Sequence, residues 1–430
     1  MPDDIQVVQF PNGLRAALKE IHSAPLISHW VWYRVGGRWE QAGRTGLSHW
    51  VEHMQFKGTP QFPAGVLDQA VAREGGTWNA FTHLDWTAYY ETLPADKIDL
   101  ALRLEADRMV NSLFAPDEVE SERTVILSEL EGSLNEPMFR LDLAIQEAAF
   151  HQHPYRNEVI GTPADLRAIQ RGDLYAHYRR YYAPNNALVT LAGDFDSAEM
   201  IQRLGEAYGG LAPAEVPELR LSPEPEPQGE QRVEISGPER TTYLRISYRA
   251  PAASQADFLT LSVVDSLLSG PSSLNMFGGG GVSNKTSRLY RAVVEQELAV
   301  SLQGSLQATA DPFLYHLTAL VRPESSPEAV LARVDEAVAR LQDQPVDEAE
   351  IRRAIKQARA LFAYGSENIT NQAFWLGYAE MFDRYAWFVN YLPALESVTP
   401  ADVQRAAQTW LSPQRRVVGI YRPESTGGSA

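Results

Sequence analysis

Residues 49–53 are His-Trp-Val-Glu-His, a spacing that could hold a metal ion. On a helix, side chains four residues apart project from the same face, and Glu52 lies beside the two histidines. The two imidazoles could bind one zinc ion while the carboxylate activates water next to it. This order, H-x-x-E-H, is the inverted zincin pattern of metallopeptidases. Because five residues can match by chance, a half-buried helix whose histidines bond to the backbone is the alternative interpretation.

The residues around the motif favour a short helix with one apolar stripe. The apolar positions that recur at helical spacing are Leu47, Trp50, Val51 and Met54. Such a stripe can pack on a core, which leaves His49, Glu52 and His53 on a different face. Gly46 precedes the segment and Gly58 follows it, so we expect the helix to be confined between them.

A catalytic zinc ion needs a third protein ligand and an open position. The chain has no cysteine, so this ligand must be His, Asp or Glu. Residues 116–136 have the pattern of a second helix, which Asp117 and Glu118 favour at its N-terminal end. Glu122 and Glu129 are seven residues apart, so two turns bring them onto one face. Either glutamate could face the histidine helix, and a merely solvated face is the alternative.

Together these segments resemble the pitrilysin/insulinase-type zinc metallopeptidases. They are most similar to the branch of mitochondrial processing peptidase and small bacterial processing proteases. The resemblance implies Glu129 as the third ligand of Zn²⁺ and Glu122 as a further catalytic-site glutamate that orients the metal site. Residues 79–82, Asn-Ala-Phe-Thr, resemble the family's edge strand, which implies that Asn79 and Ala80 bind substrate. The tracts 53–59 and 181–194 are also similar to family segments.

The order of elements predicts an α+β fold with two homologous domains, each an antiparallel or mixed sheet with helices on one face. We expect a zinc-bearing domain over residues 1–221, a Pro/Glu-rich linker over 222–231 and a second domain over 232–430. The linker should be extended and solvated. The separation in sequence between Pro116 and Pro345 equals that between Pro184 and Pro413, which suggests a duplicated unit. Ala358 stands where Glu129 would map, so the metal site belongs to the first copy alone.

The strand and helix predictions rest on periodicity. Expected strands cover 7–10, 14–18, 27–35, 78–82, 86–91, 187–192 and 417–421. Expected helices cover 64–74, 97–113, 116–130, 172–181, 258–268 and 346–362. The prediction for 78–82 and 86–91 is a hairpin-like pair, because Thr, Trp and Tyr are enriched there.

The second half lacks two residues that the resemblance leads one to expect. The run Gly278–Gly281 is not a phosphate loop, because Asn284 stands where that motif needs glycine. It is better explained as a mobile hinge or a substrate-facing loop. Many family members then carry an arginine and, seven residues later, a tyrosine that bind the substrate backbone. Here Val294 replaces the arginine, and Val300 or Ser301 the tyrosine. We therefore expect a heterodimer in which a homologous non-catalytic subunit supplies the pair, with a homodimer as the alternative.

Composition limits the remaining possibilities. The net charge of −17, from 38 basic and 55 acidic side chains, argues against a nucleic-acid binder. The amino terminus has no signal-peptide pattern, and no apolar run approaches a membrane span. We therefore expect a cytoplasmic location, although a removed targeting segment stays open. The predicted function is a zinc-dependent endopeptidase acting on peptides or unfolded segments, and the alternative is a non-catalytic zinc- or peptide-binding subunit.

Overall fold

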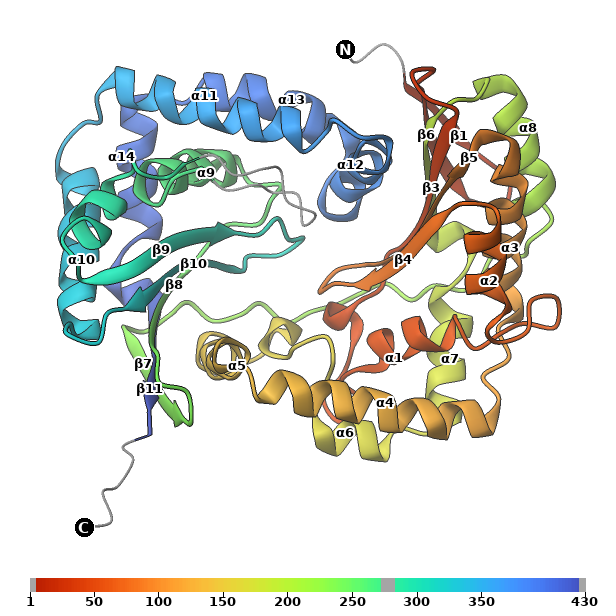
Figure 1. The fold of residues 1–430 in the computed structure, drawn as a ribbon, viewed down its shortest axis with the longest axis horizontal. Coiled ribbons are helices and arrows are strands. Elements are labelled where there is room, and N and C mark those ends of the chain that lie inside the picture. Colours follow the sequence, from red (N-terminus) through yellow and green to blue (C-terminus); the bar gives the residue numbers. More distant parts are fainter. Residues whose placement is uncertain (1–4, 272–282, 425–430) are drawn as a thin grey trace. The chain divides into compact units, whose positions relative to one another are not determined.

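The computed structural model describes residues 5–271 and 283–424. The chain forms two compact units, each assembled from three stretches of sequence (Figure 1). Unit 1 contains residues 1–131, 157–222 and 366–388, and unit 2 contains 132–156, 223–365 and 389–430. A short segment of each half of the sequence thus belongs to the unit built mainly from the other half. Among the described residues, no helix combines the length and apolar character needed to cross a membrane.

Unit 1 is built on a six-stranded mixed sheet with the order β1-β2-β6-β3-β5-β4. Its strands are β1 (Ile5–Gln9), β2 (Arg15–Glu20), β3 (Leu26–Tyr33), β4 (Thr77–Thr82), β5 (Thr87–Pro94) and β6 (Ala187–Gly193). Neighbouring strands are antiparallel except β2 and β6, which are parallel. Strand β4 lies at one edge, so one row of its backbone groups has no partner in the sheet.

The helices of unit 1 follow the expected pattern of apolar stripes. They are α1 (Leu47–Met54), α2 (Val66–Arg73), α3 (Ile98–Asn111), α6 (Pro163–Ala168), α7 (Arg171–Tyr181), α8 (Ser197–Tyr208) and α12 (Ile369–Phe382), together with most of α4 (Pro116–Leu134). Helices α3 and α8 lie on one face of the sheet and α12 on the other (Figure 1). The predicted layer on one face is therefore present, and a helix from late in the sequence covers the second face.

Alternation along β3 explains why the sheet is covered on both faces. Trp30 and Trp32 point to one side, where their ring centroids lie 5.5 Å from that of Phe374 on α12. His29 points to the other side, and its Nε2 lies 3.2 Å from the hydroxyl of Tyr208 on α8. All five side chains are buried. A strand that is buried on both faces needs two covering layers, since exposing the face with Trp30 and Trp32 would lose the burial free energy of two large side chains.

Helix α12 lies unusually close to β3. An ideal Cβ on Gly377 would lie only 2.1 Å from Nε1 of Trp32, so glycine is needed for the approach. The Trp32 indole donates a 3.1 Å hydrogen bond to Thr190, whose hydroxyl donates in turn to the carbonyl of Ala373 on α12. The polar atoms at this contact are thus paired, as buried groups must be.

Unit 2 contains a five-stranded mixed sheet with the order β7-β11-β8-β10-β9. Its strands are β7 (Gln231–Gly237), β8 (Thr242–Arg249), β9 (Ala299–Leu306), β10 (Leu314–Val321) and β11 (Arg416–Pro423). Its helices are α5 (Pro137–Ala149), α9 (Ala256–Leu268), α10 (Pro327–Asp343), α11 (Glu348–Tyr364), α14 (Pro400–Trp410) and most of α13 (Tyr385–Glu396). Helix α5 packs on β11 and β7, while α9 and α10 contact β8, β9 and β10.

The two sheets repeat the same neighbour relations. In each, a parallel pair is followed by three antiparallel pairs: β2·β6 corresponds to β7·β11, and β6-β3-β5-β4 corresponds to β11-β8-β10-β9. The short 3₁₀ turns Pro184–Asn186 and Pro413–Arg415 precede the equivalent strands β6 and β11. The duplication that the proline offsets suggested is thus visible in the topology of the described strands.

The Pro/Glu-rich segment 222–230 differs from the expected fully solvated linker. It has no helix or strand, but its carboxylates are bound. Glu224 accepts hydrogen bonds of 2.7–2.8 Å from the backbone N–H groups of residues 151–153, and Glu230 pairs with Arg416 at 2.7 Å. Three successive N–H groups form a concave anion site, which composition alone does not reveal.

Candidate metal centre and active site

Helix α1 carries the histidine motif and is positioned by a carboxylate from outside the helix. Gly46 precedes the helix in the left-handed region (φ 92°) and provides no side-chain cap. Instead, the buried carboxylate of Glu40 accepts hydrogen bonds of 2.7 Å from the backbone N–H groups of Gly46 and Ser48. These satisfy donors that the first helical turn cannot pair internally, and the negative charge is favoured at this end of the helix. Burial raises the pKa of Glu40 to about 7, against the effect of those hydrogen bonds.

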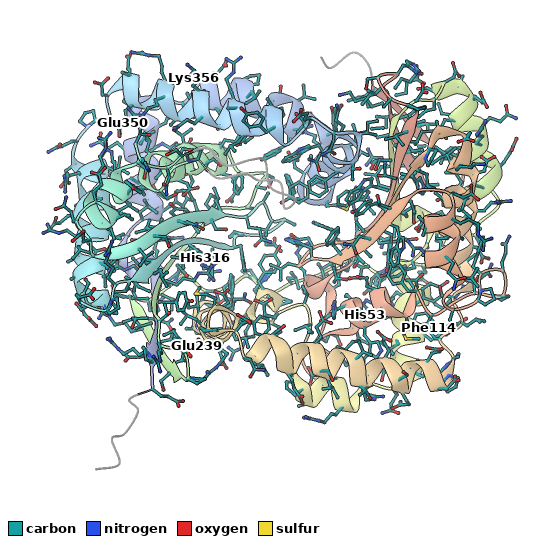
Figure 2. The ribbon with its side chains drawn as sticks, viewed as in Figure 1. His53, Phe114, Glu239, His316, Glu350 and Lys356 are labelled. Carbon is teal, nitrogen blue, oxygen red and sulfur yellow. The ribbon has the colours of Figure 1, made fainter. Side chains whose placement is uncertain are left out.

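The predicted apolar stripe of α1 is confirmed. Trp50, Val51 and Met54 are fully buried, and Leu47 is nearly so. The helix packs on α7 and on β4, so its opposite face is directed toward α4. His53, labelled in Figure 2, lies on that face. The packed stripe therefore fixes the rotation of the helix, and with it the direction of both imidazoles.

The structure brings His49, His53 and Glu129 together. One ligand atom from each lies within 4.8 Å of the others. The Nε2 atoms of His49 and His53 are 3.8 and 3.7 Å from the carboxylate oxygens of Glu129, and the two imidazole centroids are 4.5 Å apart. Tetrahedral zinc with bonds of about 2.0–2.2 Å would separate such atoms by roughly 3.3–3.6 Å. The donor set therefore fits Zn²⁺, and the three ligand atoms, which lie within 4.8 Å of one another, would draw together by up to about 1 Å around the ion.

The surroundings shift the pKa values of the two histidines in opposite directions. Burial, aided by the neighbouring His53, lowers the pKa of His49 to about 3, which keeps its ring neutral. For His53, burial disfavours the charged form, but the hydrogen bond with Glu122 and the nearby carboxylates raise its pKa overall. A metal ion bound to Nε2 of His53 would displace a proton from that atom, because the metal and the proton compete for the same lone pair.

Glu122 stands behind His53. Its Oε1 accepts a 2.8 Å hydrogen bond from Nδ1 of His53, and its Oε2 lies 2.5 Å from the ammonium of Lys57. Burial disfavours the carboxylate, but the hydrogen bonds from His53 and Lys57 outweigh it and lower the pKa of Glu122. A carboxylate that holds the proton on Nδ1 leaves Nε2 with its lone pair directed at a metal. The orienting role predicted for Glu122 requires such a contact with His53. The sequence alone predicts no role for Lys57.

Glu52 lies on α1 between the two histidines in sequence. Burial raises the pKa of its carboxyl group, and a 2.6 Å hydrogen bond from the hydroxyl of Thr82 partly opposes this. A carboxylate whose proton affinity is increased in this way is a better general base near neutral pH. Thr82 belongs to the tract 79–82, in which the resemblance implies a role only for Asn79 and Ala80. The signal for it was strand alternation, since Ala80 and Thr82 share the face directed at α1.

Asn79 and Ala80, the predicted substrate-binding residues, lie on the edge strand β4. The side chain of Asn79 is exposed, and that of Ala80 is buried. The Oδ1 atom of Asn79 accepts a 2.9 Å hydrogen bond from the backbone N–H of Ala80. An incoming peptide strand that used this N–H would have to displace the side chain of Asn79.

The positions that lack the expected arginine and tyrosine lie in unit 2. Val294 ends a π-helical turn, Tyr290–Val294, and Val300 and Ser301 lie on β9. Val300 is 54% exposed. None of these side chains can donate a hydrogen bond to a peptide carbonyl except the hydroxyl of Ser301. The run Gly278–Gly281 lies outside the described residues.

Comparisons with known proteins place the chain in a family. Residues 15–163 match the family model described as "Insulinase (Peptidase family M16)", and residues 168–358 match "Peptidase M16 inactive domain". An uncharacterized zinc protease of Mycobacterium tuberculosis is 31% identical over 411 residues, covering 94% of this chain and 90% of the relative. A probable mitochondrial-processing peptidase subunit beta of Arabidopsis thaliana is 26% identical over 374 residues, covering 85% and 69%.

The fold recurs in solved structures. A protease from Helicobacter pylori superimposes with a TM-score of 0.89 at 24% identity, covering 97% of this chain and 99% of that one. All three residues of the candidate metal centre, together with Glu52 and Glu122, lie inside the segment that matches the first family model.

Proposed function

Because this chain belongs to the pitrilysin/insulinase family of peptidases, family M16, we propose that it is a zinc-dependent endopeptidase acting on peptides and unfolded segments. The observation that carries the proposal is the convergence of His49, His53 and Glu129, with the buried Glu52 on the same helix. The three ligand side chains would hold the metal and leave a coordination position for reacting groups.

Glu52 and Glu122 have different roles in the proposed hydrolysis of a peptide bond. A zinc ion, when bound, supplies Lewis acidity toward the carbonyl and lowers the pKa of water. Glu52 removes a proton from the attacking water and delivers it to the leaving amine. Glu122 keeps the proton of His53 on Nδ1, so that Nε2 stays available as a ligand.

The edge strand β4 is the proposed platform for substrate. An extended peptide can pair with its free edge through main-chain hydrogen bonds, which give affinity with little demand on sequence. Asn79 and Ala80 would contact that peptide backbone. A folded protein cannot present an extended strand without local unfolding, so the proposed substrates are peptides and unfolded segments.

Glu52→Gln tests the proposal. Glutamine keeps an oxygen that can accept the hydrogen bond from Thr82, so the site should keep its shape and its zinc. Loss of the general base should lower kcat by about 10²–10⁴-fold. Zinc content, and cleavage of an internally quenched peptide with and without chelator, measure the two effects. Unchanged turnover in Glu52→Gln, or turnover that survives complete zinc removal, would refute the assignment.

We further propose that the active form is a heterodimer with a homologous non-catalytic subunit. The support is the absence of an arginine at Val294 and of a tyrosine at Val300 or Ser301, side chains that the resemblance assigns to substrate binding. Mixing the purified chain with a homologous partner should raise turnover well above that of the chain alone. Full peptidase activity of the chain alone, with no gain on mixing, would favour the homodimer.

A non-catalytic peptide-binding subunit is the second candidate. It is favoured by the match of residues 168–358 to a domain described as inactive. Under this alternative, the zinc-loaded chain would bind an unfolded peptide but leave it intact, even with its partner present. Mass spectrometry of the incubated peptide separates the two candidates, because cleavage products form only under the first.

A further inference from the structure

The hydroxyl of Thr82 contacts Glu52, and Thr82 ends the edge strand β4. Its Oγ1 donates to Oε2 of Glu52 at 2.6 Å. In the part of the chain that the structure describes, it is the only hydrogen-bond donor to that carboxylate. Glu52 is 9% exposed and Thr82 is half-buried. A buried carboxylate with a single donor depends on that donor for its orientation, because no competing partner holds the group.

Strand geometry makes the contact specific to Thr82. Successive side chains of a strand alternate between faces, so Trp78, Ala80 and Thr82 share one face and Thr77 and Asn79 the other. Helix α1 contacts β4, and the ring of Trp78 lies 4.5 Å from that of Phe56 just beyond the end of α1. Thr82 is thus the residue of the tract 79–82 whose polar atom reaches the catalytic helix.

The position of Thr82 links the base to the proposed substrate strand. Strand β4 pairs with β5 from Thr77↔Thr92 to Thr82↔Thr87, so its backbone is held along its whole length. A peptide paired with the free edge of β4 would take its register from that same backbone. Because the side chain of Thr82 on β4 also holds Glu52, the same strand positions both the base and the bound peptide.

We propose that Thr82 is the positioning residue for Glu52, and that it aligns the base with peptide bound along β4. The catalytic part of this inference rests on the proposed peptidase function. The contact itself does not, since it can be measured in the metal-free protein. Misalignment of a base by about 1 Å is known to cost on the order of 10²-fold in rate.

Three variants separate positioning from general structure. Thr82→Val keeps the shape of the side chain and removes the donor, Thr82→Ser keeps the donor, and Thr77→Val is a matched control on the exposed face of the same strand. We expect Thr82→Val to lower kcat by about 10–100-fold. Its KM and zinc content should stay within about threefold of wild type, because neither the edge of β4 nor the ligands change. Thr82→Ser and Thr77→Val should retain wild-type kcat.

A double-mutant cycle in metal-free protein supplies a readout independent of turnover. Thr82→Val should lower the thermal midpoint by about 2–4 °C when Glu52 is present. The same substitution should have little effect in a Glu52→Ala background, because its hydrogen-bond partner is already gone.

The outcomes are distinct. Wild-type kcat in Thr82→Val, loss of zinc in that variant, or failure of Thr82→Ser to restore kcat would each overturn the inference. Additive midpoints in the cycle would overturn it as well. If the wild-type chain cleaves no peptide with any partner, the proposed function fails, and the cycle alone then decides whether Thr82 positions Glu52.

Discussion

Replacing Glu122 by glutamine should weaken zinc binding without removing a ligand. Glu122 is 4% exposed and faces two donors, Nδ1–H of His53 at 2.8 Å and the ammonium of Lys57 at 2.5 Å. Glutamine offers one oxygen and one NH₂ group, so one of these contacts becomes donor against donor. Lys57 also loses its closest counter-charge, so its ammonium no longer attracts the side chain of residue 122 or holds it in place.

The magnitude follows from the lost contact. A hydrogen bond to a charged group contributes about 1.5–3 kcal/mol, and 1.4 kcal/mol corresponds to a factor of ten. Glu122→Gln should therefore raise the Kd for zinc by about 10–100-fold, the range found for groups that orient metal ligands. Competition with a chromophoric chelator at fixed pH measures this Kd. Glu120→Gln is the control, because Glu120 is an exposed residue of the same helix that pairs only with Arg123 among the described side chains.

Unchanged zinc affinity in Glu122→Gln would show that Glu122 does not orient His53. If Glu120→Gln weakened zinc binding to the same extent, the effect would reflect loss of charge on α4 alone. Circular dichroism of both metal-free variants shows whether the helix is retained.

Other substitutions test the ligand set, the packing and the protonation of buried groups. Glu129→Gln should lower bound zinc well below one equivalent in elemental analysis of dialysed protein, because an amide is a poor ligand for zinc; full occupancy would exclude Glu129 as the third ligand. Gly377→Ala should destabilise unit 1 by about 1–3 kcal/mol in chemical unfolding, since the added methyl group collides with Trp32. The control Gly132→Ala, where no atom lies within 4 Å, should be neutral or gain up to about 1 kcal/mol. Burial lowers the pKa of His177 to about 3, below its unfolded value of about 6.5, so the unfolded chain takes up a proton that the folded chain does not. Stability from this group is complete well above pH 6.5 and is lost as the pH falls, by about 3 kcal/mol at pH 4.5. His177→Gln should remove that loss in unfolding titrations, and parallel pH profiles of the two proteins would contradict the assignment.

Local sequence patterns predicted the elements that carry the candidate site. The apolar spacing around His49 and His53, the helix over 116–130 and the hairpin-like pair at 78–91 all correspond to observed helices and strands. These signals are local, because helical and strand periodicity depend only on which faces of an element are buried. The spacing of Glu122 and Glu129 placed both on α4, but only the family resemblance chose between them, since seven residues put both on one face.

Other features depend on contacts between distant residues and left no local signal. Glu40 caps α1 although it lies six residues before Gly46, the N-cap position. The usual capping residues occupy the N-cap position itself, so the sequence around the helix start does not reveal this cap. Lys57 has the ordinary look of a surface lysine until α4 brings Glu122 to it. The acidic segment 222–230 matched the composition of a free linker, because the backbone N–H groups that bind Glu224 carry no side-chain signature.

The placement of α12 in unit 1 has a consequence for how the protein comes into being. The face of the first sheet that carries Trp30 and Trp32 is closed by residues 369–382, which leave the ribosome long after the histidine helix does. In a nascent chain that ended at residue 222, the indole rings of Trp30 and Trp32 would be exposed to water. Folding of unit 1 therefore waits until nearly nine-tenths of the polypeptide has been made, and a protein truncated before α12 should aggregate rather than fold.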